Sequence, residues 1–152
     1  GANLVYAVGE ERSPKPGGCV LRFDGAAWKR IARTPAPLRA VYASPAHGMV
    51  AVGGNQVLIF RNGEWSRPSL DSPVELRGVW LGAPHEAYLA GAVATSADPR
   101  PVVFALHQGG WYEQPIAGRG RLEAVWGSRA DVAFAVGGLG KRGMIVSGCR
   151  YP

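Results

Sequence analysis

Four short apolar segments, each ending in a glycine, recur along the whole chain. No polar residue interrupts any of them, so both faces of each segment are apolar. A short run of this kind is typical of a strand that is covered on both sides. The four segments are Val5–Gly9, Met49–Gly53, Ala87–Gly91 and Ala133–Gly137.

Two further motifs repeat in the same register. A Leu-x-x-Val-aromatic motif precedes three of the glycines, and its valine lies 12 residues before the glycine each time. A turn ending in tryptophan follows three of the glycines. The first motif carries Tyr42, Trp80 and Trp126, and the second carries Trp28, Trp65 and Trp111. A repeat of about forty residues made of short strands is typical of a β-propeller blade. We therefore predict an all-β fold of four-stranded antiparallel blades.

The second unit shows the expected strands most clearly. Asn62-Gly63 predicts a two-residue hairpin between its third and fourth strands, and Asp24-Gly25 predicts the same hairpin in the first unit. We expect each segment-closing glycine (Gly9, Gly53, Gly91 and Gly137) to have a conformation or a close approach that a side chain would block. The strands expected in the second unit are Leu38–Ser44, Met49–Gly53, Gln56–Arg61 and Trp65–Ser69.

The units divide the chain at about residues 1–37, 38–75, 76–121 and 122–152, within a single β-propeller region. The first unit lacks its first strand and the last unit lacks its fourth, which leaves a partial ring of about 3.5 blades. Closed propellers have roughly four to eight blades. The sequence therefore predicts part of a larger propeller, or a ring completed by a protein partner or by self-association.

The repeat resembles that of kelch-type propellers. The resemblance rests on the strands that end in Gly53-Gly54 and Gly137-Gly138, followed by a hairpin that ends in tryptophan at Trp28, Trp65 and Trp111. Repeats of similar appearance also occur in bacterial surface propellers. The resemblance covers nearly the whole chain, but it differs in unit length, and two of the four units lack the second glycine. It implies a propeller fold.

The composition of the 152 residues, 47% apolar and 18% charged, is that of a globular protein. No apolar run reaches the roughly 18 residues of a transmembrane segment, and the start of the chain does not read as a signal peptide. Because the chain lacks an initiator methionine, we expect a processed product or a fragment, and an extracellular, periplasmic or cell-surface location is favoured. The two cysteines, Cys19 and Cys149, are expected to be ordinary thiols unless the first and last units are neighbours.

Residue types that carry chemistry are present but scattered. His47, His85 and Asp131 occupy equivalent turns in successive units, which a ring should hold far apart, so we predict no metal site there. The stretch Gly138–Gly143 matches G-x-G-x-x-G, but it links two expected strands and opens no helix. Repetition of the aromatic positions favours packing between blades, with a row of sugar-binding aromatics as the alternative. We predict no catalytic residue and no cofactor.

Charge is distributed unevenly over the expected fold. The connections from second to third strand, and from one unit to the next, share one face, with eleven basic residues against six acidic ones. Lys29, Arg30, Arg61 and Arg129 balance the acids on the opposite face. The basic face also carries the two long insertions, Glu10–Gly18 and Ala92–Pro101. The residues proposed to bind an acidic surface or polysaccharide are Arg12, Lys15, Arg100, Arg119, Arg121, Lys141 and Arg142.

The favoured function is a non-enzymatic β-propeller binding or scaffold module that makes protein–protein contacts through the loops of its basic face. A carbohydrate-binding, lectin-like propeller is one alternative. Part of a propeller enzyme, such as a glycosidase, is another. Nucleic acid is not expected as a partner, because no basic run interleaves with exposed aromatics in a recognition motif.

Overall fold

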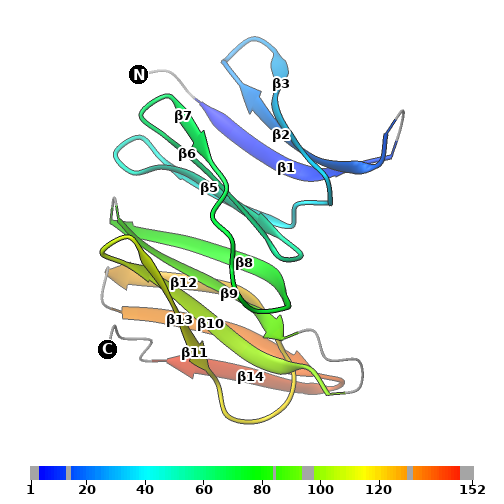
Figure 1. Ribbon diagram of the computed structural model, residues 1–152, viewed down its shortest axis with the longest axis vertical. Coiled ribbons are helices and arrows are strands. Elements are labelled where there is room, and N and C mark those ends of the chain that lie inside the picture. Colours follow the sequence, from blue (N-terminus) through cyan, green and yellow to red (C-terminus); the bar gives the residue numbers. More distant parts are fainter. Residues whose placement is uncertain (1–3, 13–14, 84, 94–97, 130–131, 148–152) are drawn as a thin grey trace.

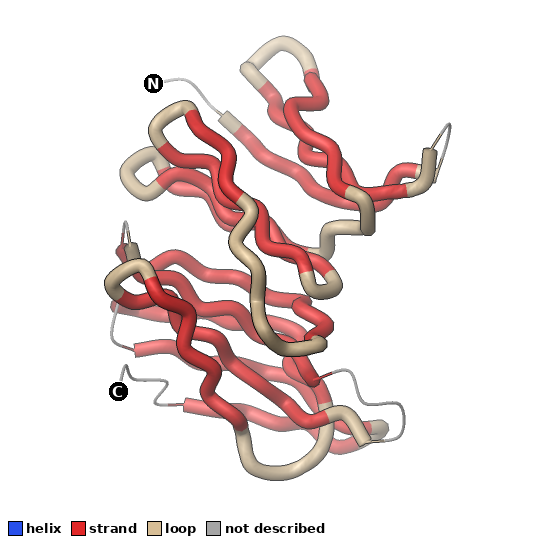
Figure 2. The backbone as a smooth tube through the Cα atoms, viewed as in Figure 1, coloured by secondary structure: helices blue, strands red, loops and turns tan. Residues whose placement is uncertain are grey.

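The computed structural model describes residues 4–12, 15–83, 85–93, 98–129 and 132–147, and within these ranges the chain consists of strands, turns and short loops (Figure 2). The strands form four antiparallel sheets, and the described residues include no helix (Figure 1). None of them forms a helix long and apolar enough to cross a membrane. The all-β expectation is confirmed.

Each sheet is a meander in which every strand pairs with its neighbours in the chain. The first sheet contains β1 (Val5–Glu11), β2 (Gly17–Phe23) and β3 (Trp28–Thr34). The second contains β4 (Ala40–Ser44), β5 (Gly48–Gly53), β6 (Gln56–Arg61) and β7 (Glu64–Ser66). The third contains β8 (Val74–Ala83), β9 (Glu86–Val93), β10 (Arg100–His107) and β11 (Gly110–Pro115). The fourth contains β12 (Arg121–Arg129), β13 (Val132–Leu139) and β14 (Arg142–Ser147).

This division into three, four, four and three strands is the one that the repeat predicts. The expected unit boundaries are slightly displaced, since β8 begins at Val74 and β12 at Arg121. In the second sheet, the first strand begins at Ala40 rather than Leu38, and the last ends at Ser66 rather than Ser69.

One of the two predicted hairpins is confirmed and the other is wrong. Asn62 and Gly63 both have positive φ, 52° and 83°, as a type I′ turn requires. Asp24-Gly25 lies instead in a four-residue loop, because Phe23 pairs with Trp28. There the Asp24 carboxylate accepts hydrogen bonds from the backbone N–H groups of Ala26 and Ala27, at 3.1 and 3.0 Å, and closes the loop.

The sheets pack face to face in chain order, with one apolar cluster in each gap. Side chains of a strand point alternately to its two faces. In β9, Ala87 and Leu89 therefore pack towards the second sheet, whereas Tyr88 and Ala90 pack towards the fourth. This two-sided burial is the physical reason for the uninterrupted apolar run in β9.

The first strands of successive sheets lie against one another, β4 against β8 and β8 against β12. Backbone hydrogen bonds tie the second and third sheets each to the one before it. The N–H of Leu38 donates to the carbonyl of Gly9 at 3.3 Å, and the N–H of Leu76 donates to the carbonyl of Gly54 at 2.7 Å. Both leucines belong to the repeated Leu-x-x-Val motif and both are buried.

The repeated glycines are explained by close approach at three of their four positions. A Cβ on Gly53, Gly91 or Gly137 would clash with the backbone where the first strand of its own sheet begins. Gly9 has no such neighbour, and a Cβ there would meet nothing within 4 Å. The expectation is therefore wrong at Gly9, because the first sheet has no strand before β1 among the described residues.

Candidate functional site

The seven proposed basic residues lie at one end of the strands. They are at or beside the β1–β2, β9–β10, β11–β12 and β13–β14 connections, and the antiparallel topology brings these connections to the same side, on the right in Figure 1. We call this side the connection end. The opposite side, with the β4–β5, β6–β7 and β8–β9 turns, is the turn end. All seven side chains are exposed.

Three of the seven have carboxylate neighbours. Arg12 lies 3.6 Å from Glu10, Arg119 lies 3.1 Å from Asp98, and Arg121 lies 3.7 Å from Glu75. The other four have no carboxylate within 4 Å in the part of the chain that is described. These four, which we call the free cations, are Lys15, Arg100, Lys141 and Arg142.

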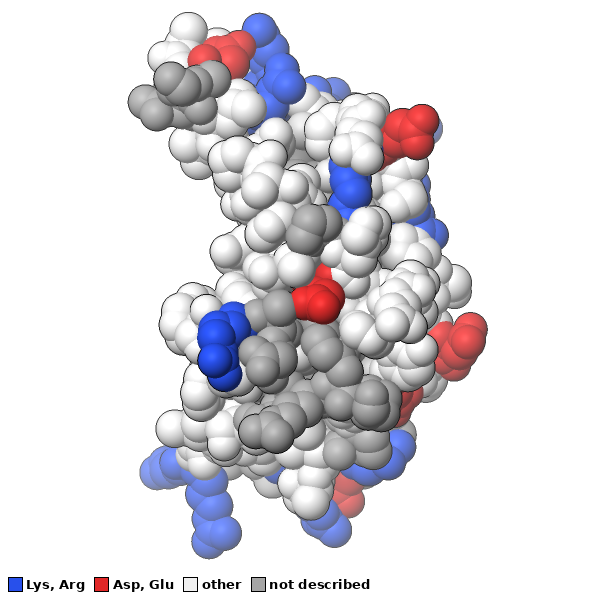
Figure 3. Space-filling model, turned by 90° about the vertical axis from the view of Figure 1, so that its left-hand side faces the viewer, with Lys and Arg blue, Asp and Glu red and all other residues white. Residues whose placement is uncertain are grey.

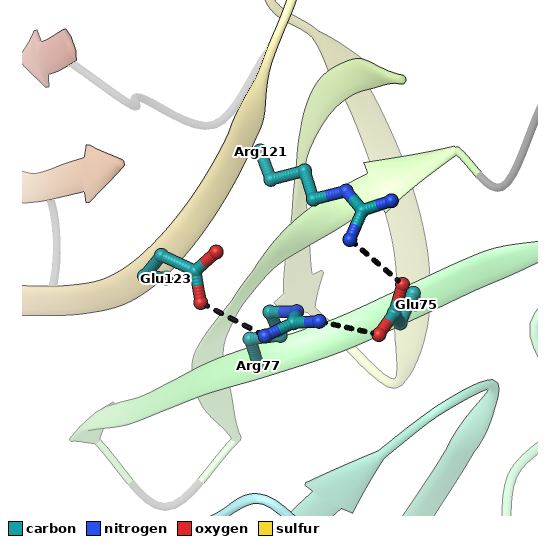
Figure 4. Close-up of polar contacts among 4 residues, drawn as sticks. All are labelled: Glu75, Arg77, Arg121 and Glu123. Atoms are coloured by element: carbon teal, nitrogen blue, oxygen red, sulfur yellow. Dashed lines mark hydrogen bonds and ion pairs between the residues drawn. The ribbon is translucent and has the colours of Figure 1, made fainter. Parts of the chain in front are cut away.

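Arg121 belongs to a network that the sequence reading missed (Figure 4). Arg77 on β8 donates from Nη2 to Glu75 at 2.6 Å and from Nη1 to Glu123 on β12 at 3.2 Å. Partial burial by itself lowers the pKa of Arg77, but the hydrogen bond to Glu75 and the charge of Glu123 outweigh it and raise that pKa above its usual value. The network joins the third and fourth sheets. Its signal in the sequence is that Arg77 and Glu123 occupy the same place in the repeat, after the leucine, with opposite charge.

A second network lies on the first sheet. Glu11 accepts hydrogen bonds from Arg33 at 2.9 Å and from Arg30 at 2.7 Å. The bond from Arg33 lowers the pKa of Glu11 and raises that of Arg33. Arg30 was expected to balance acids at the turn end. It reaches Glu11 near the connection end instead, because its long side chain spans part of the strand.

The aromatic residues of the Leu-x-x-Val motif do not share one environment. Tyr42 is half-buried and packs against the clusters on both sides of the third sheet, and Trp80 is only 5% exposed. Trp80 lies over Gly127, where a Cβ would come within 2.5 Å of its ring. Trp126 is 58% exposed, so the packing role expected from repetition is wrong there. No described sheet covers that face.

The tryptophans that follow the turns pack mainly within their own sheets. Trp28 packs against Phe23 in a tilted arrangement with ring centroids 5.4 Å apart, and Trp65 packs against Phe60 in the same way at 4.7 Å. The expectation that they pack between sheets is wrong for these two. Trp111 does pack against the cluster between the second and third sheets.

The outer face of the fourth sheet carries an apolar patch. Strand register places Trp126 opposite Phe134, and Val136 opposite Ile145. All four side chains are exposed, Ile145 by 78%. We call these four residues the outer patch. An apolar patch of neighbouring exposed side chains commonly marks an interaction surface.

The turn end contains a pocket of about 750 Å³. Residues from three sheets line it, including Tyr6 of β1, Arg61 of β6, His47 of the β4–β5 turn and His85 of the β8–β9 turn. Figure 3 views this end, where charged side chains are scattered among many uncharged ones. The two histidines, which a ring was expected to hold far apart, both line this one pocket, and Asp131 lies outside the described residues. The described residues contain no group of three or more His, Cys, Asp or Glu side chains placed to hold a metal ion.

Two further sequence features can be placed. The glycine-rich stretch turns between β13 and β14, and no helix follows it in the described chain, as expected for a hairpin. Cys19 lies half-buried in β2, whereas Cys149 lies outside the described residues.

In comparisons with known proteins, no protein-family model matches the chain, and no curated protein matches it significantly.

Proposed function

We propose that the chain is a non-enzymatic binding module of β-propeller type, in which the four sheets are blades and the connection end engages an acidic protein surface. The blade assignment is supported by the face-to-face packing and by the adjacent first strands β4, β8 and β12. Loops on a rigid β-scaffold are common binding elements.

The four free cations carry this proposal. Each is exposed and lacks a carboxylate partner within 4 Å among the described residues, and all four lie at the connection end. Cations that are not neutralised within the chain create a positive field that attracts anionic surfaces and speeds association. The three paired arginines contribute less, because their charge is partly compensated.

Binding of poly-glutamate, followed by titration calorimetry at several salt concentrations, tests the proposal. The charge-neutralised variant K141Q/R142Q is expected to bind about tenfold more weakly, since each exposed charge contributes roughly 0.2–1 kcal/mol. The affinity of the wild-type chain should fall with added salt more steeply than that of the variant.

The matched control is K29Q/R129Q, which removes two positive charges at the turn end. It should bind poly-glutamate as the wild-type chain does. Equal loss in both variants would show attraction to net charge alone and would contradict a site at the connection end. Heparin binding, measured alongside, shows whether the chain prefers an acidic polysaccharide to an acidic polypeptide.

We propose further that the ring is completed by self-association or by a partner chain, and the outer patch supports this. Trp126 holds the place in the repeat that Trp80 holds one sheet earlier, and Trp80 is covered by Gly127 of the next sheet. By the same geometry, the group that covers Trp126 would be a further antiparallel sheet, with a small residue facing the indole.

Native mass spectrometry over a range of chain concentrations tests self-association. We expect discrete oligomers for the wild-type chain and a shift to monomer for W126E, with Y112E as a control on an exposed aromatic of β11 outside the patch. A wild-type chain that stays monomeric at every concentration would overturn self-association and leave only a partner chain as the occupant.

A further inference from the structure

We infer that the pocket at the turn end binds a small organic anion, a carboxylate on an apolar body, whose charged group is held by Arg61 and His85. This site lies at the other end of the strands from the free cations, so it goes beyond the proposed function and its test is separate.

The pocket has the size and position of a ligand site. Its volume of about 750 Å³ is within the usual range for drug-sized ligands. Its wall comes from three sheets: Tyr6 from the first, Met49 and Phe60 from the second, and His85 from the turn that leads into β9. A pocket built from separate sheets keeps its shape only while the sheets stay packed together.

Arg61 gives the wall an uncompensated positive charge. Its Nη1 lies 3.1 Å from Nδ1 of His85, while its Nε and Nη2 are buried and have no hydrogen-bond partner among the described residues. Within the described chain, no carboxylate lies within 4 Å of the guanidinium, and neither Glu64 nor Glu86 lines the pocket. Buried guanidinium N–H groups without partners are costly, and an anion is the group that satisfies them best.

The contact with Arg61 also fixes the role of His85. A guanidinium can only donate, so Nδ1 of His85 must accept, and the ring proton is then on Nε2. In this contact, His85 offers its Nε2–H as a donor. Because Nε and Nη2 of Arg61 are covered by protein, the carboxylate reaches them only when the whole Arg61 side chain changes its rotamer.

The remaining wall explains why the ligand needs an apolar body. Tyr6, Met49 and Phe60 line the pocket, and Phe60 also packs against the tilted ring of Trp65. Apolar walls with a few convergent polar groups are typical of small-molecule sites. His47 also lines the pocket and adds a second imidazole to its wall.

Phenylacetate and its neutral analogue phenylacetamide are the probes, with affinity measured by titration calorimetry on the intact chain. We expect phenylacetate to bind at least tenfold more tightly than phenylacetamide. In R61Q, phenylacetate affinity should drop to the level of the amide, while R61K should recover part of the loss because the charge remains but the fork of donors does not. K29Q, which removes a cation at the same end outside the pocket, should leave both affinities unchanged.

A second measurement needs no substitution. Phenylacetate should shift the side-chain Nε–H resonance of Arg61 in ¹⁵N-resolved spectra, and phenylacetamide should not. Equal affinity for the two probes, no detectable binding of phenylacetate, or a folded R61Q that binds like the wild-type chain would each overturn the inference. Poly-glutamate binding should be unchanged in R61Q, so this site and the connection end succeed or fail independently.

Discussion

The third and fourth sheets are built from the same repeat but have different surroundings. The third sheet is covered on both faces, and its residues Trp80, Tyr88 and Val103 are buried. The described residues cover the fourth sheet on one face only, and Trp126, Phe134 and Ile145 are exposed on the other. Equivalent residues thus differ in burial because of their neighbours rather than their own strand. A repeat specifies which side chains can be covered, and the adjacent sheet decides whether they are.

Truncating the two equivalent tryptophans should give the largest difference. Trp80→Ala should lower the free energy of unfolding by roughly 3–5 kcal/mol, because it leaves a cavity over Gly127. Trp126→Ala should change it by less than about 1 kcal/mol in the monomeric chain, since the indole is mostly exposed. Urea unfolding measures both. Equal losses would show that the outer patch is covered in solution.

Adding a methyl group at two repeated glycines should give the next largest difference in stability between sheets. Gly91→Ala should be destabilising by roughly 1–3 kcal/mol, because the new Cβ clashes with the backbone of Glu75. Gly9→Ala is the matched control and should be neutral or slightly stabilising, because the space around it is open. Thermal unfolding of the pair checks this, and a destabilised Gly9→Ala would mean that another segment covers β1.

The ion-pair network between the third and fourth sheets should contribute less. A double-mutant cycle with Arg77→Met and Glu123→Gln should give a coupling of roughly 0.2–1 kcal/mol, the range for partly exposed pairs. The coupling should shrink in high salt. A value near zero at low salt would mean that β8 and β12 are held together by apolar packing alone.

The smallest effect should appear as a pH dependence in the first sheet. The pKa of Glu11 is lowered by its hydrogen bond from Arg33, so the folded chain binds this proton less readily than the unfolded chain. The wild-type chain should therefore have a higher free energy of unfolding than Glu11→Gln above about pH 4.3, the usual pKa of glutamate. This difference is lost as the pH falls below that value. Unfolding midpoints measured between pH 3 and 7 check this.

Glu64→Gln serves as the reference for that series. It removes a carboxylate that no cation approaches within 4 Å among the described residues. A pH-dependent difference of the same size in Glu64→Gln would assign the effect to general charge and not to the Glu11 network.

Sequence reasoning succeeded where local chemistry decides the structure. The Leu-x-x-Val motif, the apolar runs and Asn62-Gly63 each depend on neighbours a few residues away, and they predicted the strands and their grouping into sheets. Asp24-Gly25 failed because the side chain of Asp24 closes a longer loop with its own backbone. The hydrogen bonds of Asp24 are also local, but the Asp-Gly dipeptide alone does not show that they favour a longer loop over a two-residue turn.

The candidate sites were less accessible to prediction. The pocket requires Tyr6, Arg61 and His85 to meet from three sheets, and their separation in the sequence carries no signal of this. The exposure of Trp126 depends on which neighbour is present, which repetition cannot show. The basic residues were placed correctly at one end, but the pairing of Arg119 and Arg121 with acids depends on side-chain reach.

The hydrogen bonds from Leu38 and Leu76 to the preceding sheet have a consequence for folding. Each sheet contacts chiefly the sheets before and after it, so the chain behaves as a nearly one-dimensional array with nearest-neighbour coupling. In such an array, unfolding starts at the ends and cooperativity grows with each added unit. Hydrogen exchange should therefore be slowest in β9 and β10, whose neighbours hold them from both sides, and fastest in β3 and β14.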